Sequence, residues 1–211
     1  MRIIKKSDEN EMVSEFLKME IASTRYGLKI ESILREINVS KRVITDGNIA
    51  DENENRIRAE ILGIFRRYKK DAEIFENFPS PVEWVWAVFD KEDLSKIIYI
   101  EYSYWNEISN FTGSPLEAAK TILSGKTIYD VPNDGFIQAA RKLRDGHKFP
   151  PLIFLTEQNE NRFIILEGHL RMTAFCLEPE LFRNVPVLLG YCSSEGLNKW
   201  YGEMPEKRYT H

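Results

Sequence analysis

The sequence predicts an α+β fold in which a helical N-terminal region precedes a small mixed sheet with flanking helices. Three observations support this prediction. Apolar residues recur every three or four positions within residues 11–77, two short apolar runs occupy 152–155 and 163–166, and helix start and stop signals separate the later segments. Of the 211 residues, 43% are hydrophobic, enough to bury a substantial core.

Residues 1–78 are predicted to form the helical region. The polar stretch 45–55 contains Gly47 and is predicted to be a loop before a further helix that carries Ile57, Ile61 and Phe65. Pro79 and Pro81 then interrupt the pattern. Because proline disfavours helix in the residue before it, the boundary is placed there, and residues 79–211 form the expected α/β domain.

The second half of the chain begins with many aromatic residues between 84 and 111, which favours a buried sheet and its covering. Ser114-Pro115-Leu116-Glu117 is a helix start signal, and the helix is expected to end at Gly125. A second helix is expected from about 133 or 134 to Gly146. Strands at 152–155 and 163–166, a helix at about 169–177 and a strand at 185–189 complete the prediction.

Composition limits the classes of function. The 29 basic and 33 acidic residues give a net charge of −4, so no global field attracts a nucleic acid backbone. A DNA contact would have to be local, and the basic run of Arg66, Arg67, Lys69 and Lys70 is the candidate; a solvated helix face is the alternative.

The chain has no apolar run of about 18 residues and only two cysteines, Cys176 and Cys192. It also lacks the apolar core of a signal peptide. We therefore expect a cytoplasmic protein with no membrane partner. These features leave the oligomeric state undetermined.

The segment most informative about chemistry joins the strand at 163–166 to the following helix. It reads Glu167-Gly168-His169-Leu170-Arg171. A glycine permits a sharp turn there, and the unpaired amides that follow it favour a bound anion. Arg171 could grip phosphate oxygens, His169 could donate or shuttle a proton, and Glu167 could act as a base or hold a metal ion.

The alternative is a plain joint between a strand and a helix. In that interpretation Glu167 caps the helix, His169 is a surface residue and Arg171 pairs with a nearby acid.

Residues from about 134 to 189 resemble the ParB/sulfiredoxin superfamily, which includes the ParB-like nuclease domain. The resemblance depends on Pro150-Pro151 before a strand, on the acid-Gly-His-x-Arg turn at 167–171, and on Val185-Pro186-Val187 in the closing strand. It implies a small α/β domain whose turn binds nucleotide phosphates at Gly168, His169 and Arg171. Known members bind CTP and DNA, or use ATP or ADP.

This sequence departs from two branches of the superfamily. No cysteine lies between Gly168 and His169, which argues against sulfinic acid repair. Only about twenty residues follow Leu189, too few for the DNA-binding domain of the partition proteins.

Two hypotheses therefore stand. The first is a nucleotide-binding protein, either a Mg-dependent phosphotransferase or a nucleotide hydrolase, that takes ATP, CTP or another nucleotide. Gly168, Leu170 and Arg171 would hold phosphate, His169 would both bind and catalyse, and Glu167 would act in catalysis and hold Mg²⁺. The second is a non-catalytic DNA- or protein-binding module.

Overall fold

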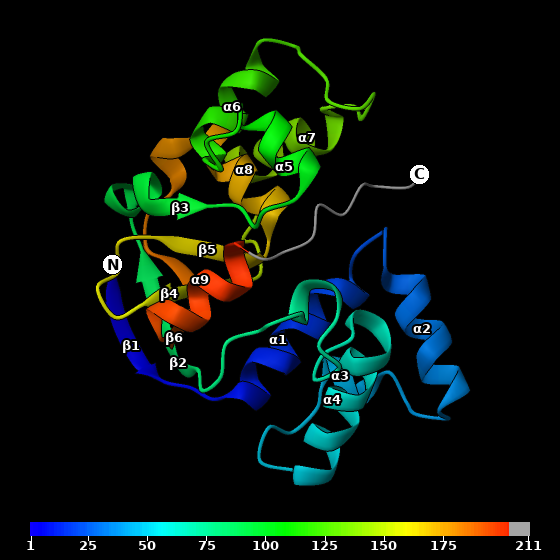
Figure 1. Ribbon diagram of the computed structural model, residues 1–211. Helices are drawn as coiled ribbons and strands as arrows, with labels where there is room; N and C mark the ends of the chain where they lie inside the picture. Colours follow the sequence, from blue (N-terminus) through cyan, green and yellow to red (C-terminus); the bar gives the residue numbers. More distant parts are fainter. Residues whose placement is uncertain (203–211) are drawn as a thin grey trace.

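The structure is a computed structural model that describes residues 1–202. It has the expected α+β architecture, built around a six-stranded mixed sheet (Figure 1). The strand order is β1-β2-β6-β4-β5-β3. These strands span Arg2–Lys6 (β1), Glu83–Phe89 (β2), Ile97–Ile98 (β3), Leu152–Glu157 (β4), Phe163–Glu167 (β5) and Val185–Cys192 (β6).

Parallel and antiparallel pairs alternate towards one edge of this sheet. β1 with β2, β2 with β6, and β4 with β5 are antiparallel, whereas β6 with β4 and β5 with β3 are parallel. The hairpin of β4 and β5 brings the start of β4 beside the end of β5, because Ile153 pairs with Glu167. The segment Pro150-Pro151 therefore lies next to the turn that follows β5.

Helices cover both faces of the sheet (Figure 1). On one side of the sheet lie α1, α2, α3 and α4, which span Glu9–Ile21, Gly27–Glu36, Arg42–Thr45 and Glu52–Arg66 and pack on one another, together with α9 at Ser194–Gly202, which contacts β4. The other face is covered by α5, α6, α7 and α8, which span Ser103–Ile108, Pro115–Leu123, Asp134–Arg144 and His169–Leu177. Short 3-10 helices lie at Glu73–Phe75 (η1), Lys91–Lys96 (η2) and Pro179–Leu181 (η3).

The apolar runs 152–155 of β4 and 163–166 of β5 are buried on both faces of the sheet. In β4, Ile153 and Leu155 belong to the core under α1–α4, whereas Leu152 and Phe154 belong to the core under α5–α8. Successive side chains of a strand point to opposite faces, which produces this division. The apolar runs of the sequence are thus strands buried on two sides.

The local helix signals are confirmed. α6 ends at Leu123, just before Gly125, and α7 ends at Arg144, just before Gly146; both glycines have positive φ. Ser114 is the N-cap of α6, but its side chain makes no capping hydrogen bond.

β1, the start of α4 and the helix α9, which follows the last predicted strand, differ from the sequence prediction. The strand β1 was not expected; all five of its residues are exposed, so no alternation of apolar and polar side chains marks it. α4 begins at Glu52 inside the predicted loop, because the Asp51 side chain accepts hydrogen bonds from the amides of Asn53 and Glu54.

Candidate anion site at the N-terminus of α8

Gly168 forms the turn between β5 and α8. Its φ of +104° lies where residues with a side chain are strained. A Cβ at this position would also lie 2.4 Å from Leu152 Cδ2 and 3.1 Å from Arg171 Nη2. The close approach of β4 and the left-handed backbone together require glycine.

The first turn of α8 has amides that its own helix leaves unpaired. The bond from the Met172 amide to the Gly168 carbonyl oxygen, 2.8 Å long, is the first of the helix. The amides of residues 169–171 precede it, and no side chain among residues 1–202 caps this end of the helix. The positive end of the helix dipole lies at the same place and also favours a bound anion.

Arg171 does not point its guanidinium at an open cavity, as the anion-binding prediction requires. Its Nη1 donates to the carbonyl oxygens of Pro150 and Pro151 at 2.8 and 2.9 Å. Its Nη2 pairs with the Glu167 carboxylate and contacts the sulfur of Met19. Arg171 therefore braces the turn against α1 and the segment before β4.

Glu167 shares this arrangement. Burial raises the pKa of its carboxyl, the Arg171 guanidinium lowers it and the nearby Glu20 raises it, with a net shift upward. A resident Mg²⁺ needs several oxygen ligands. Glu167 is already occupied by Arg171, and among residues 1–202 no three His, Cys, Asp or Glu side chains converge into a metal site. These donors do not fit a resident Mg²⁺.

His169 is largely buried beside aromatic rings rather than on the surface. Its ring lies nearly parallel to those of Trp105 and Tyr99, with centroid distances of 5.1 and 5.9 Å. Burial, followed by the charges of Arg66 and Arg171, lowers the pKa of His169 to about 3. Its Nε2 is buried and has no hydrogen-bond partner in the described part of the chain.

Arg66 reaches this cluster from the last turn of α4. Its Nη2 pairs with Glu20 Oε1 at 2.7 Å, and its guanidinium carbon lies 4.2 Å from the centroid of the Tyr26 ring. Its Nε is buried and has no partner among the residues that the structure describes. In the sequence Arg66 belongs to the basic run, and this role was not predicted. The signal was its position four residues after the fully buried Leu62, on the same face of α4.

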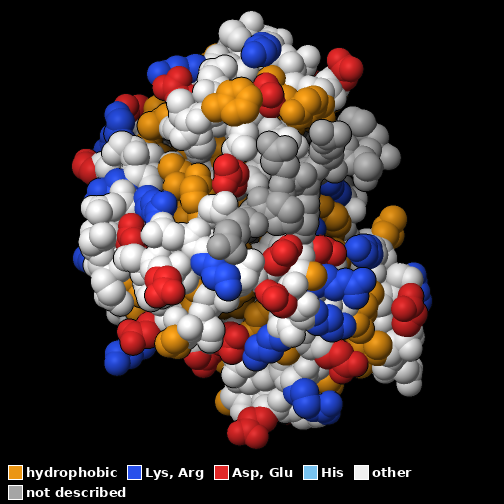
Figure 2. All heavy atoms as spheres, in the orientation of Figure 1, with side chains coloured by type: hydrophobic (Ala, Val, Ile, Leu, Met, Phe, Trp, Pro, Cys, Tyr) orange, Lys and Arg blue, Asp and Glu red, His pale blue; other side chains and the backbone are white. Residues whose placement is uncertain are grey.

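The remaining basic run does not form a continuous charged stripe. Lys69 Nζ lies 3.4 Å from Glu9 Oε2. Arg67 and Lys70 are exposed, but Arg66 faces inward and does not extend the basic surface that they form. Figure 2 shows basic and acidic side chains interspersed over the visible part of this region. A DNA contact through residues 66–70 gains no support from this arrangement.

Both cysteines, Cys176 and Cys192, are buried free thiols. Burial is the main cause that raises the pKa of each thiol. Within residues 1–202, no helix has the length and apolar character needed to cross a membrane.

Comparison of the chain with protein-family models, with curated proteins and with solved structures finds no match in any of the three.

Proposed function

We propose that this protein binds a nucleotide by its phosphates at the N-terminus of α8. The observation that carries the proposal is a pair of buried polar atoms that lack hydrogen-bond partners. Arg66 Nε and His169 Nε2 have no partner among residues 1–202, and the charge of Arg66 acts on His169, the first residue of α8. A buried polar atom without a partner costs free energy, and an oxyanion would supply the missing acceptors.

The electrostatic potential supports an anion as well. Glu20 and Glu167 neutralise the formal charges of Arg66 and Arg171. Nevertheless, besides burial, both guanidiniums lower the pKa of His169, so each contributes a positive potential at its ring. The helix dipole adds to it. Selectivity for phosphate would thus come from directed donors rather than from net charge.

The neighbouring side chains favour a phosphate that carries an organic ring. Trp105 is half-buried beside the His169 ring, and Leu170 is 43% exposed on the first turn of α8. An aromatic face and an apolar side chain can contact a nucleobase. The resemblance of residues 134–189 to the ParB/sulfiredoxin superfamily supports the same ligand class.

Phosphoryl transfer or nucleotide hydrolysis is the reaction that such a site would perform. In this proposal Mg²⁺ arrives bound to the phosphates, as it commonly does for nucleotides. Burial raises the pKa of Glu167, which suits a proton acceptor, but its carboxylate would first have to leave Arg171. Arg171 acts as a brace for the turn and His169 donates to a phosphate oxygen.

Calorimetric titration of the full chain with ATP, CTP, GTP and ADP, each with Mg²⁺, tests the proposal. At least one nucleotide should bind with a Kd below about 1 mM, as is expected for a specific small ligand. Arg66→Gln should weaken that affinity at least ~10-fold, since one charge-assisted contact contributes about 1.5 to 3 kcal/mol.

Arg67→Gln is the matched control, because it removes the same charge from the exposed neighbouring residue. Since Arg66→Gln leaves Glu20 without its partner, the double variant Glu20→Gln/Arg66→Gln checks for a folding defect. The proposal fails if no nucleotide binds at millimolar concentration, or if the Arg66 variants and the Arg67 control have the same affinity. Turnover is measured separately, by ³¹P NMR of the bound nucleotide with wild type and with Glu167→Gln.

A further inference from the structure

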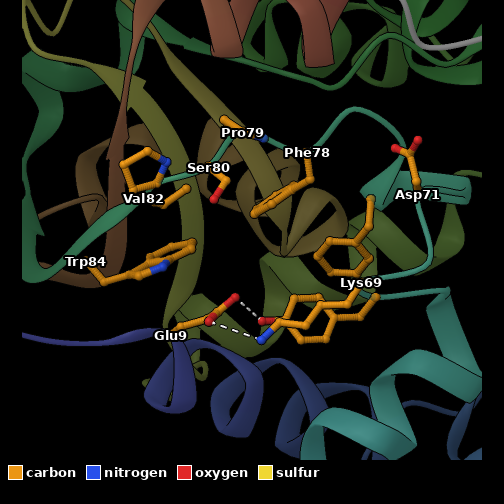
Figure 3. A pocket seen from close by; sticks show the side chains of 11 residues that line it. Glu9, Lys69, Asp71, Phe78, Pro79, Ser80, Val82 and Trp84 are labelled. Carbon is orange, nitrogen blue, oxygen red and sulfur yellow. Dashed lines mark hydrogen bonds and ion pairs between the residues drawn. The ribbon is translucent and has the colours of Figure 1, made fainter.

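A cavity lies at the other end of α1, away from the α8 turn. It has a volume of about 450 Å³ and is bounded by the start of α1, the segment after α4, the linker at 79–82 and the start of β2 (Figure 3). Ligand sites typically have volumes of about 300 to 1,000 Å³ and combine apolar walls with a few polar groups. Glu9 borders this cavity, whereas Glu20 pairs with Arg66 at the opposite end of the same helix.

The walls of the cavity are aromatic. Trp84 and Phe78 both border the cavity (Figure 3), and Tyr68 and Phe75 complete its aromatic lining. Tyr68 and Phe75 are in edge contact at 5.0 Å, and Phe75 and Phe78 at 5.1 Å. Phe78 in turn packs against the buried Trp200. These contacts hold the rings in place, so the wall needs little reordering when a ligand enters.

The charged groups at the cavity give it a formal charge of −1, from the carboxylates of Glu9 and Asp71 and the ammonium of Lys69. Tyr68 adds no negative charge, because burial and its hydrogen bond to Glu9 raise the pKa of the phenol. The ion pair of Lys69 with Glu9 is long, at 3.4 Å, and both side chains are more than half exposed. Such a pair is weak and can yield to another cation.

The backbone of the segment after α4 is unusual. Arg67, Lys69, Asp71, Glu73 and Asn77 all have φ between +44° and +63°, without being glycine. Each such residue costs free energy, and clusters of them occur where a site requires a particular backbone shape. Asp71 is further fixed by the hydrogen bond that its carboxylate accepts from the Asn77 amide at 2.7 Å.

We infer that this cavity binds a small organic cation with an aromatic or apolar body, such as an amidinium, a guanidinium or a substituted ammonium. The aromatic side chains of Trp84, Tyr68 and Phe78, which line the cavity, would attract the cation and cover its apolar part, while the carboxylates of Glu9 and Asp71 set the sign of the charge. This inference is independent of nucleotide binding at α8.

The test uses benzamidine as the cationic probe, with benzamide and benzoate as its neutral and anionic counterparts. Calorimetric titration of the full chain at fixed ionic strength should show benzamidine binding at least ~10-fold more tightly than either counterpart, equivalent to about 1.4 kcal/mol. Asp71→Asn should weaken benzamidine binding at least threefold while its side chain still accepts from Asn77.

Asp145→Asn is the matched control, since it removes the same charge from an exposed residue at the end of α7. Phe78→Leu, which removes a ring but keeps an apolar side chain, should also weaken binding. Three outcomes would each overturn the inference. The first is no benzamidine binding at about 10 mM, a concentration at which even weak ligands bind. The second is equal binding of benzoate, and the third is equal effects of the Asp71 and Asp145 variants. Saturating ATP with Mg²⁺ should leave the benzamidine affinity unchanged.

Discussion

Gly168 sets the direction in which α8 leaves the sheet. Two separate causes disfavour any other residue at this position. Its backbone is left-handed, and a Cβ would meet Leu152 at 2.4 Å. Gly146 shares the first cause only, because its φ is +82° and nothing lies within 4 Å of the Cβ it lacks. The two glycines therefore separate backbone strain from steric exclusion.

We predict that Gly168→Ala lowers the free energy of unfolding by about 2 to 4 kcal/mol, whereas Gly146→Ala lowers it by about 1 kcal/mol. Urea unfolding followed by tryptophan fluorescence measures both. Equal losses for the two variants would mean that β4 does not press against the turn.

His169 should make stability depend on pH in a defined window. The pKa of this residue falls from its usual 6.5 to about 3 in the folded protein. The unfolded chain therefore takes up a proton below pH 6.5 that the folded protein excludes, so this contribution to stability is present above pH 6.5 and is lost as the pH falls towards 3.

Between pH 7 and pH 5, wild type should lose up to about 2 kcal/mol more stability than His169→Gln. The comparison with the variant is needed because Glu167, with a raised pKa, contributes with the opposite sign. Urea unfolding at the two pH values gives the difference. Parallel losses in both proteins would show that His169 titrates normally.

Individual site residues were predictable only where their chemistry is local. Gly168 and the amides after it follow from a glycine between a strand and a helix. Arg66 and Glu20 could not be assigned to the site, because their approach to α8 depends on how α1 and α4 pack on the sheet. In the same way, the hydrogen bonds that Arg171 donates to the carbonyl oxygens of Pro150 and Pro151 depend on the pairing of β4 with β5.

At the scale of elements, α4 and the loop before it are joined by Arg58. This side chain is 0% exposed, and it donates to the carbonyl oxygens of Val43 and Asn48 at 2.8 and 2.9 Å. It also pairs with Glu54 at 3.4 Å. Gly47 provides the room, since a Cβ there would lie 2.0 Å from Arg58 Nη1.

Arg58→Met should lower the free energy of unfolding by about 3 to 5 kcal/mol, because it leaves the carbonyl oxygens of Val43 and Asn48 without their side-chain donor and removes the cation paired with Glu54. Arg56→Met is the control, since Arg56 is on the exposed face of α4 and bonds only to Asn53 among the described contacts. Chemical denaturation measures both. A loss below 1 kcal/mol for Arg58→Met would contradict this role of the arginine.

Elements with signals in their own sequence were predicted well, and those that depend on partners were not. α6, α7 and α8 have glycine or proline at their ends, and β4 and β5 are apolar on both faces. β1 has neither kind of signal; its Arg2, Lys5 and Lys6 become part of a strand only because β2 offers an edge.

At the scale of the whole molecule, the helices before residue 78 and the sheet after it share one core. That core contains Phe16 and Leu62 from the helices together with Ile153 and Leu188 from the sheet. β1, at the start of the chain, also pairs with β2. The helical region thus covers one face of the sheet.

We predict that the full chain unfolds in one cooperative transition, because separating the helices from the sheet would expose this core to water. Urea curves from far-UV circular dichroism, which reports mainly the helices, and from tryptophan fluorescence, which reports β2, α5 and α9, should coincide. Two midpoints separated beyond experimental error would indicate two independently folding units.

The most direct test of the anion site is NMR titration of the ¹⁵N-labelled full chain with ATP or CTP in the presence of Mg²⁺. The amide signals of His169, Leu170 and Arg171 should shift and saturate together, with the same dissociation constant that calorimetry gives. The account would be contradicted if these three amides stayed in place at saturating nucleotide, or if the shifts were confined to residues outside the turn and the cluster around Arg66.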